Sequence, residues 1–484
     1  MLWRDLRVWQ VYGANTDVGK TIVSTILCRA LQRRAPNNGV LYFKPVSTGP
    51  QDEADDRHIS KFAPGVLSKC LTQFSEPVSP HLAAQRDSAT PDSIQDGKII
   101  AKIRRELSKQ AGAGTRYALL ETAGGVLSPG PSGTVQADLY RPLRLPTLLV
   151  GDSKLGGIGT TLSAFESLHV RGYDVDSVVL LNEPKWGNFG YLRDHLAKRD
   201  VRVISLPTPP PRVDDPSEDE EALRRFYDEC AGSAEVDAFL ESLNKKHFQR
   251  ISALTSMPSE AEDIVWHPFR QHGISHNIVA IDSAHGDNFE AYNQAADPVV
   301  ASAAEDSGAG IQPAVTTKSS TSLITPLFDA SASWWTQGFG HGNPELALAA
   351  AHAAGRYGHV MFAHSVHEPA LNLCYNILKT LANPRLARVF FTDNGSTAME
   401  VAIKMALRAS SVRYGWHKDD DGPPVEVLGL KGSYHGDTIG AMNASEPSVF
   451  NKNVDWYKPQ GVWFDPPQVL MHKADGGSRY PNPS

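Results

Sequence analysis

The chain has 484 residues, of which 41% are hydrophobic and 21% charged, and its net charge is -7 at pH 7. This length and composition predict a folded protein of about two or three domains. The charge balance excludes the broad basic surface typical of nucleic-acid-binding proteins, and no run approaches the roughly 18 apolar residues of a membrane span. Anionic ligands would therefore need local sites.

The cysteines indicate a reducing compartment. Cys28, Cys70, Cys230 and Cys374 lie far apart and form no CxxC pair, so neither a zinc site nor a disulfide framework is expected. The first apolar run, 8–13, leads directly into a glycine loop, which leaves no room for a targeting peptide. We expect a soluble, cytoplasmic protein that binds neither membranes nor nucleic acid.

Apolar runs alternate with helical patterns between residues 7 and 206. The helical patterns include 21–34 and 160–171, and the runs between such segments are RVWQVYG, GVLYFKPV, YALLETAGG, LPTLLVGD, SVVLLNEP and VRVISLP. This alternation predicts βαβ units, and hence an α/β fold with a mostly parallel sheet flanked by helices.

A glycine loop follows the first run, in the order strand, loop, helix. The strict phosphate-loop pattern is G-x-x-x-x-G-K-[ST], whose backbone N–H groups cradle phosphates while Lys and Ser/Thr reach phosphate and Mg²⁺. Here Gly13 and Gly19 are one residue further apart, with Ala14 at the strict glycine position, and Lys20 and Thr21 follow. We interpret the loop as a nucleotide site, the alternative being an ordinary strand-to-helix turn.

Three acidic residues follow predicted strands and could hold Mg²⁺, which prefers hard oxygen ligands. Asp55 and Asp56 lie after the second run, and Glu121 ends YALLE just before AGG. Each residue alone is more typical of a helix cap or a surface position. Their conjunction with the glycine loop favours a metal site.

The composition changes near residues 245–260. Before this point, 207–221 is Pro-rich and then acidic, which indicates a solvated loop opening a helix, and 233–254 predicts an amphipathic helix capped by Ser233. We therefore expect two domains, 1–245 and 260–484.

The second part begins with an expected inserted or disordered patch at 296–322, rich in small and polar residues. Helices are then expected at 344–356, 368–381 and 396–408, and strands at 387–391 and 426–430.

The first part resembles a known family along most of its length. The blocks GANTDVGKT, YFKPVSTG, EADD, EPVSPH, LLETAGGV, SKLGGIGTT and LLNEP occur in the order found in dethiobiotin synthetase, over roughly residues 8–210. The resemblance implies a P-loop NTPase-like domain that uses Mg-ATP to close a ureido ring on 7,8-diaminopelargonic acid, by way of a carbamate and its phosphate anhydride. It also implies a homodimer.

The same resemblance implies roles for individual residues. The implied catalytic residues are Lys20, Lys44 and Asp17, and the implied metal ligands are Thr21, Asp56 and Glu121, with Asp55 as a possible substitute for Asp56. ATP would contact Gly13, Asn15, Thr16, Val18, Gly19, Lys20, Thr21 and Asn182. The substrate would contact Thr48, Gly156, Gly157 and Ile158.

The second part resembles the amino-terminal region of adenosylmethionine-8-amino-7-oxononanoate aminotransferase, a fold type I enzyme that uses pyridoxal phosphate (PLP). The resemblance lies in DASASWWTQGFGHGNP, HVMFAHSVHEPALNL, VFFTDNGSTAMEVAIKMALR and KGSYHGDTIGAMNAS. It implies a PLP-type site with Gly395 and Ser396 at the cofactor phosphate, Tyr434 against the ring, and Trp334 and Trp335 as a substrate wall.

PLP chemistry also needs a Schiff-base lysine and an Asp at the pyridinium nitrogen. In the family both lie far downstream of the YHGD block, whereas this sequence ends at Ser484. We therefore expect the PLP-type site to be vestigial and transamination to be absent, unless another polypeptide completes this half. For the first part, the alternative is a P-loop ATPase switch that binds a partner.

Overall fold

Seven parallel strands form the centre of the first of two compact units in the computed structural model, Met1–Gly358 and His359–Ser484. The structure describes residues 1–37, 39–90, 94–268, 277–297, 299–300, 321–360, 364–416 and 425–467. Each unit is described by itself. The sheet order is β3-β2-β4-β1-β5-β6-β7. The strands are β1 (Arg7–Gly13), β2 (Val40–Thr48), β3 (Leu67–Phe74), β4 (Tyr117–Gly125), β5 (Thr147–Val150), β6 (Val175–Leu181) and β7 (Arg202–Leu206).

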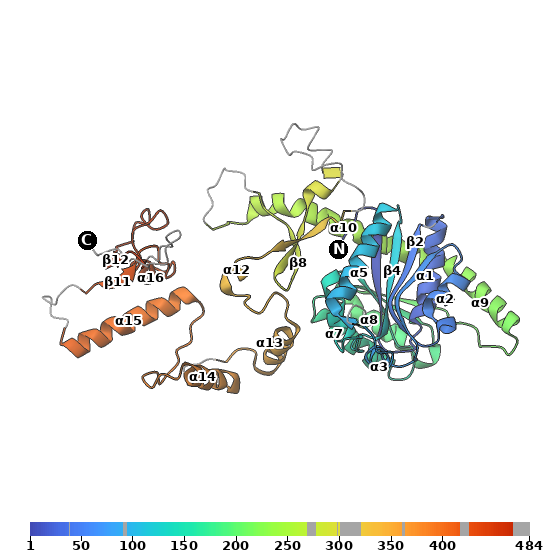
Figure 1. Cartoon of the computed structure of the whole chain (residues 1–484), viewed down its shortest axis with the longest axis horizontal. Coiled ribbons are helices and arrows are strands. Elements are labelled where there is room, and N and C mark those ends of the chain that lie inside the picture. Colours follow the sequence, from blue (N-terminus) through green and yellow to red (C-terminus); the bar gives the residue numbers. More distant parts are fainter. Residues whose placement is uncertain are drawn as a thin grey trace, which may run out of the picture. The chain divides into compact units, whose positions relative to one another are not determined.

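Helices cover both faces of this sheet (Figure 1). Side chains alternate along β1, so that Trp9 and Val11 enter one buried cluster while Val8 and Tyr12 enter the other. The first cluster takes side chains from α1 (Lys20–Arg34), α2 (Asp55–Phe62), α9 (Pro216–Ala231) and α10 (Ala234–Ile264). The second takes them from α5 (Asp96–Gly112), α7 (Gly157–His169) and α8 (Asn188–Ala197). The predicted α/β fold is thereby confirmed.

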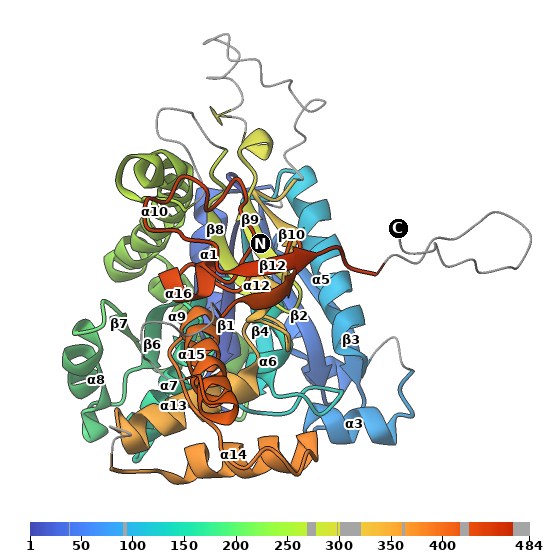
Figure 2. The ribbon, with the colours of Figure 1, turned by 90° about the vertical axis from the view of Figure 1, so that its left-hand side faces the viewer.

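Strand β3 was not among the predicted strands. It pairs with β2 alone, at one edge of the sheet, and most of its side chains are only half-buried (Figure 2). Its sequence, LSKCLTQF, is correspondingly mixed in polarity, because an edge strand keeps one face towards solvent. The short helix α3 (Pro80–Arg86) follows it.

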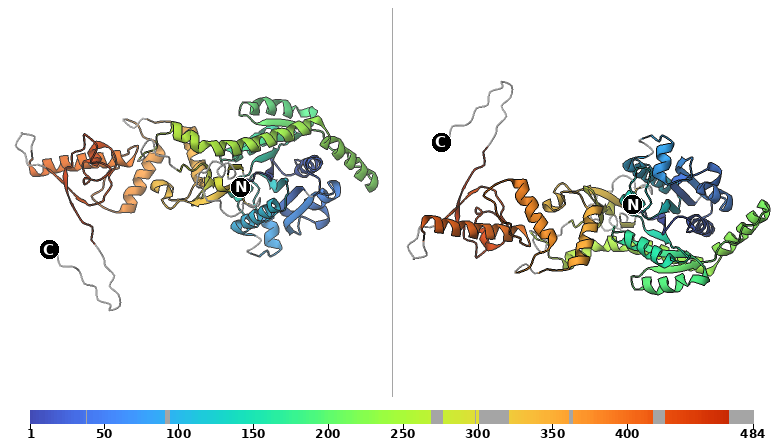
Figure 3. Two further views of the ribbon diagram at one scale, coloured as in Figure 1. Left: turned by 90° about the horizontal axis from the view of Figure 1, so that it is seen from above. Right: turned by 90° about the horizontal axis from the view of Figure 1, so that it is seen from below.

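The acidic end of the 207–221 segment opens helix α9, as predicted. The Asp215 side chain caps it by accepting hydrogen bonds from the N–H groups of Ser217 and Glu218. Ser233 caps α10 in the same way, through Val236 N–H. Helix α10 continues ten residues beyond the predicted end at Leu254, through Pro258 (Figure 3, green), and the side chains there are mostly exposed, so no apolar pattern marked the extension.

An antiparallel three-stranded sheet packs within the first unit. Its strands are β8 (Ile281–His285), β9 (Asn288–Tyr292) and β10 (Ile324–Phe328), in the order β10-β9-β8. Tyr292 and Leu323 share a buried cluster with Leu2 and with Ile251 and Leu254 of α10. The first compact unit extends to Gly358, and the domain boundary expected at 245–260 stays a prediction. Most of the expected patch at 296–322 lies outside the described residues.

The first unit ends with the short helix α12 (Ala332–Trp335) and with α13 (Pro344–Tyr357). The second unit contains α14 (Glu368–Leu381), α15 (Gly395–Tyr414) and α16 (Ile439–Met442), with β11 (Val427–Leu430) parallel to β12 (Gly461–Phe464). The predicted strand at 387–391 was wrong. A strand needs a hydrogen-bonded neighbour, and none of the described residues pairs with this segment.

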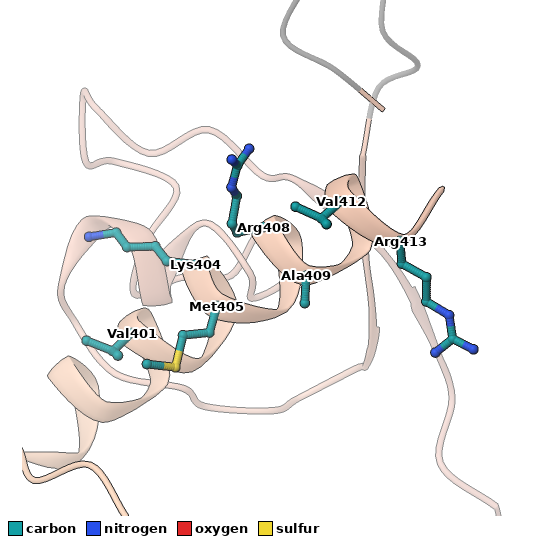
Figure 4. A pocket seen from close by; sticks show the side chains of 7 residues that line it. All are labelled: Val401, Lys404, Met405, Arg408, Ala409, Val412 and Arg413. Atoms are coloured by element: carbon teal, nitrogen blue, oxygen red, sulfur yellow. The ribbon is translucent and has the colours of Figure 1, made fainter. Parts of the chain in front are cut away.

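Helix α15 carries apolar side chains on an open surface. Val401, Met405 and Val412 line a shallow hollow together with basic side chains such as Lys404 and Arg408 (Figure 4). Met405 and Val412 are 55% and 61% exposed. No described residue of this unit covers them fully.

Candidate functional site

The glycine loop joins the end of β1 to the start of α1, at the carboxyl edge of the parallel sheet. Gly19 precedes the helix with φ +89°, and a Cβ there would lie 2.5 Å from Leu181 Cδ1. At Gly13 a Cβ would lie 2.7 Å from the carbonyl oxygen of Asn15. Only glycine fits both positions, and the loop leads into a helix N-terminus, which is an anion-binding element.

Lys20 is the first residue of α1 and is 8% exposed. Its ammonium lies 3.5 Å from the carbonyl oxygen of Asn15 and so remains over the loop. Burial, and then the charge of Lys44, lower the pKa of Lys20. A buried ammonium of this kind is stabilised when a phosphate enters the loop.

Lys44 lies at the centre of the charged cluster. It projects from β2, and its Nζ is 2.8 Å from Glu121 Oε1 and 2.6 Å from Asp55 Oδ2. Burial alone would lower the pKa of Lys44, but Glu121 and Asp55 outweigh burial and raise it. Burial likewise opposes ionisation of Asp55, yet Lys44 holds the pKa of that carboxyl below its usual value. These charges stabilise one another.

Oxygen ligands of the kind that Mg²⁺ prefers gather beside Lys44. The Thr21 hydroxyl lies 2.7 Å from Asp55 Oδ1 and 3.2 Å from Glu121 Oε1. One hydroxyl and two carboxylates at the start of a phosphate loop fit Mg²⁺ chemically, with further oxygens coming from water and nucleotide. Within the described residues, no group of three or more His, Cys, Asp or Glu side chains is placed to hold a metal ion.

Asp55 makes the side-chain contacts to this cluster, whereas the resemblance implied Asp56 as the metal ligand with Asp55 as a possible substitute. Asp55 and Asp56 are consecutive in the first turn of α2, so their side chains leave the helix in directions roughly 100° apart. Asp55 contacts Thr21 and Lys44 through its side chain, whereas Asp56 accepts hydrogen bonds from Ser60 and Ser68 through its carbonyl oxygen.

Two cavities flank the loop. One, of about 160 Å³, is lined by Asn182, by residues of the loop that leads to α8, and by Asn188 at the start of that helix. The backbone N–H of Asn182 donates to Leu206, which holds the residue at the end of β6. Asn15 and Thr16 are exposed in the glycine loop, where Thr16 N–H donates to Asn15 Oδ1 at 2.8 Å. Val18 is buried beneath them.

The second cavity, of about 290 Å³, lies between Asn15, the segment after β4 and helix α7, which contributes Thr160 and Ser163. Gly156 precedes α7 with φ +87°, and a Cβ on Gly157 would lie 2.0 Å from the Asp152 carbonyl oxygen. Three further residues were predicted for the site. Asp17 is exposed and has φ +56°, and Thr48 is half-buried at the end of β2. Ile158 packs against the core.

The sequence analysis missed Ser24. Its hydroxyl lies 2.7 Å from Glu121 Oε2, and both residues are fully buried. Ser24 lies one turn beyond Lys20 and Thr21 on α1, and this spacing on the sheet-facing side of the helix was the available signal.

The PLP-type residues of the second unit lie around the start of α15. Asn394 caps the helix through Thr397 N–H, and Ser396 Oγ is 2.8 Å from Thr438 Oγ1. A Cβ on Gly436 would lie 2.2 Å from Ser396 Oγ, so the chain after Tyr434 passes close to the helix start. Gly395 is the first residue of α15.

Tyr434 is 70% exposed, and its hydroxyl donates to Asp437. Trp334 and Trp335 belong to the first unit and are also largely exposed, with φ values of +57° and +66°.

The described residues of the second unit suit the phosphate group of PLP but do not supply the rest of a PLP site. The Gly395–Ser396 helix start suits a phosphate group. Lys404 and Lys431, however, form ion pairs with Glu400 and Asp465.

Comparisons with known proteins match both parts of the chain. Residues 8–206 match the AAA domain family, and residues 325–475 match the class-III aminotransferase family, whose cofactor is PLP. A bifunctional dethiobiotin synthetase/adenosylmethionine-8-amino-7-oxononanoate aminotransferase of Emericella nidulans is 51% identical over 98% of this chain and 58% of its own length.

A plant relative shows the same arrangement. The bifunctional dethiobiotin synthetase/7,8-diamino-pelargonic acid aminotransferase of Oryza sativa, named mitochondrial, is 36% identical over 97% of this chain and 61% of its own length. The chain thus spans about three fifths of the length of these relatives. The comparisons confirm the resemblance of both parts.

No helix within the described residues is long and apolar enough to cross a membrane.

Proposed function

We propose that the first unit is an ATP- and Mg²⁺-dependent cyclo-ligase that forms dethiobiotin from 7,8-diaminopelargonic acid and CO₂. The observation that carries this proposal is the cluster of Lys20, Lys44, Thr21, Asp55 and Glu121 at the carboxyl edge of the sheet. The similarity to bifunctional dethiobiotin synthetases over nearly the whole chain supports the choice of substrate.

The reaction brings two anions together. One substrate amine captures CO₂ as a carbamate, the carbamate attacks the γ-phosphorus of ATP with loss of ADP, and the second amine displaces phosphate to close the ring. Lys20 and Lys44 supply positive charge where carbamate and phosphate meet. Mg²⁺, when bound, would further neutralise the phosphate oxygens.

Lys44 and Glu121 perform this role from fixed positions. Both are almost completely buried, and the ion pairs of Lys44 keep its ammonium charged and oriented before substrate arrives. Such preorganisation lowers the barrier, because the charge need not reorient during the reaction. We assign the metal to Thr21, Asp55 and Glu121, with Asp55 replacing Asp56 on the contacts described above.

Further roles follow the family resemblance. Asp17 would face the substrate amines, and Thr16 and Thr48 would donate hydrogen bonds to substrate or phosphate. The N–H groups at Gly156, Gly157 and Ile158 would hold the distal carboxylate across a homodimer, and Asn182 would hold adenine. The 290 Å³ and 160 Å³ cavities beside the loop support these substrate and adenine positions. A cytoplasmic location stays a prediction.

The test of the ligase combines the purified chain with Mg-ATP, labelled bicarbonate and 7,8-diaminopelargonic acid. We expect acid-stable label to appear in step with ADP, because ring closure converts the acid-labile carbamate into a ureido group. ADP release without acid-stable label would instead support the alternative of an ATPase switch. The absence of both products would contradict the proposal.

The aminotransferase half has a separate test. Titration with PLP tests the expectation of a vestigial site: an internal aldimine absorption band that borohydride can fix requires a Schiff-base lysine, and its absence would agree with that expectation. Appearance of such a band would overturn the expectation without affecting the ligase assignment.

A further inference from the structure

We infer that Ser24 is a positioning residue for the Glu121 carboxylate, and through it for the metal ligands. This inference rests on the proposed function, because it concerns the same metal site. Ser24 belongs to α1, whereas Glu121 lies on β4, so the contact joins the helix that carries the phosphate loop to the strand that carries the acid.

The two oxygens of Glu121 have different partners. Oε2 lies 2.7 Å from the hydroxyl of Ser24, while Oε1 faces Lys44 at 2.8 Å and Thr21 at 3.2 Å. The carboxylate is therefore held at both ends. Oε1 is the oxygen directed towards Thr21 and Asp55, where we place the metal.

Comparison with the neighbouring Thr25 shows that the Ser24 hydroxyl has an unusual hydrogen-bond partner for a residue inside a helix. Inside a helix, a Ser or Thr hydroxyl commonly donates to the carbonyl four residues earlier. Thr25 does so, with its Oγ1 2.6 Å from the Thr21 carbonyl oxygen. Ser24 donates to Glu121 instead, although it is in the same turn.

A neutral donor suits this role. The Ser24 hydroxyl orients the carboxylate without cancelling its charge, so the full negative charge remains available to a cation. Without this donor, the buried Oε2 would lose its 2.7 Å hydrogen bond, and the carboxylate would be held less firmly in its present orientation.

The test measures Mn²⁺ binding in the presence of ADP by electron paramagnetic resonance, and so requires no turnover. We expect Ser24→Ala to weaken Mn²⁺ binding about 10- to 100-fold, the range typical of residues that orient metal ligands. Ser24→Cys keeps the size and a weak donor, and should fall between Ser24→Ala and the parent chain.

Cys28→Ala is the matched control. Cys28 is one turn further along α1 and equally buried, and its truncation removes similar packing without removing a hydrogen bond to Glu121. It should bind Mn²⁺ like the parent chain. Thermal unfolding identifies variants that do not fold. If Ser24→Ala does not fold, Mn²⁺ binding by Ser24→Cys still tests the role of Ser24.

The outcomes separate the two proposals. Equal Mn²⁺ binding by folded Ser24→Ala and the parent chain would overturn the role of Ser24 while leaving the proposed ligase intact. A similar loss in Cys28→Ala would also overturn it, because packing would then explain the effect. If the parent chain with ADP bound no Mn²⁺, the proposed metal site itself would fail.

Discussion

At the scale of single residues, Lys44 connects the parts of the candidate site. Its ammonium lies within 2.8 Å of both Asp55 and Glu121. Since the pKa of Asp55 is lowered, this carboxylate contributes stability above the ordinary Asp pKa of about 3.9, and the contribution is lost as pH falls through the lower folded value. The Asp55 carboxylate and the Lys44 ammonium are thus both charged at neutral pH.

The first prediction concerns Glu121. Glu121→Gln removes the buried negative charge that faces Thr21 and Lys44, so Mg-ATP-dependent ring closure should fall by about 100-fold or more. Steady-state assays of ADP release with the diamine substrate measure this. Glu53→Gln, at an exposed position, is the control. Activity near that of the control would refute the assigned role.

The second prediction compares adjacent acids. Asp55→Asn should weaken Mg²⁺ dependence about 10- to 100-fold, because it removes a carboxylate from the Thr21–Lys44 cluster, whereas Asp56→Asn should leave it nearly unchanged. The measurement is ADP release against Mg²⁺ concentration for the two variants. The reverse ranking would restore Asp56 as the ligand.

At the scale of elements, the β8–β9 hairpin is attached to the parallel-sheet domain by buried charge. Asp282 of β8 has a side chain only 4% exposed, which lies 2.8 Å from Arg250 of α10 and 3.5 Å from Arg144. Arg250 also reaches the Arg144 carbonyl oxygen. The pairing of one buried carboxylate with two arginines explains why this hairpin, distant in sequence from the seven-stranded sheet, belongs to the same compact unit.

The third prediction tests this attachment. Asp282→Asn leaves two arginines without their shared carboxylate, and should destabilise the docked hairpin by about 3 kcal/mol, the cost typical of breaking a buried ion pair. Faster hydrogen exchange at the β8 and β9 amides would report it. Asp287→Asn, on the exposed turn of the hairpin, provides the control, and equal exchange in both variants would contradict the prediction.

At the scale of the whole first unit, a buried histidine makes stability depend on pH. His247 of α10 lies against the amino-terminal segment, with its Nε2 3.4 Å from the Arg4 carbonyl oxygen. Burial, and then the charge of Arg7, lower the pKa of His247 to about 4. The folded unit therefore holds this ring neutral where the unfolded chain would protonate it.

The fourth prediction follows from the sign of this shift. Between pH 6.5 and 4 the unfolded chain binds the additional proton, so the stability of the folded unit should fall with pH by up to about 3 kcal/mol. Urea unfolding of the parent chain and of His247→Gln at pH 7 and pH 5 measures it. The variant should lose less stability on acidification, and an equal loss would exclude His247 as the cause.

The order of strands, loops and helices in residues 7–206 could be predicted because each signal is local. Core strands such as β1 and β4 are apolar over a short run, and the glycine loop has a motif of its own. Edge strand β3 was not predicted because its side chains are mixed in polarity and mostly half-buried, so they form no apolar run. The expected strand at 387–391 failed for the opposite reason, since an apolar run forms a strand only with a partner.

The sequence by itself determined the parallel α/β fold, the phosphate loop and the presence of acids near it, because these depend on local pattern and spacing. Only the tertiary structure decided that Asp55 rather than Asp56 meets Thr21, that Ser24 reaches Glu121, and that the β8–β10 sheet joins the first unit. These outcomes depend on which face of a helix meets which strand. That choice is made by packing among residues far apart in the sequence, such as Ser24 and Glu121, which are 97 positions apart.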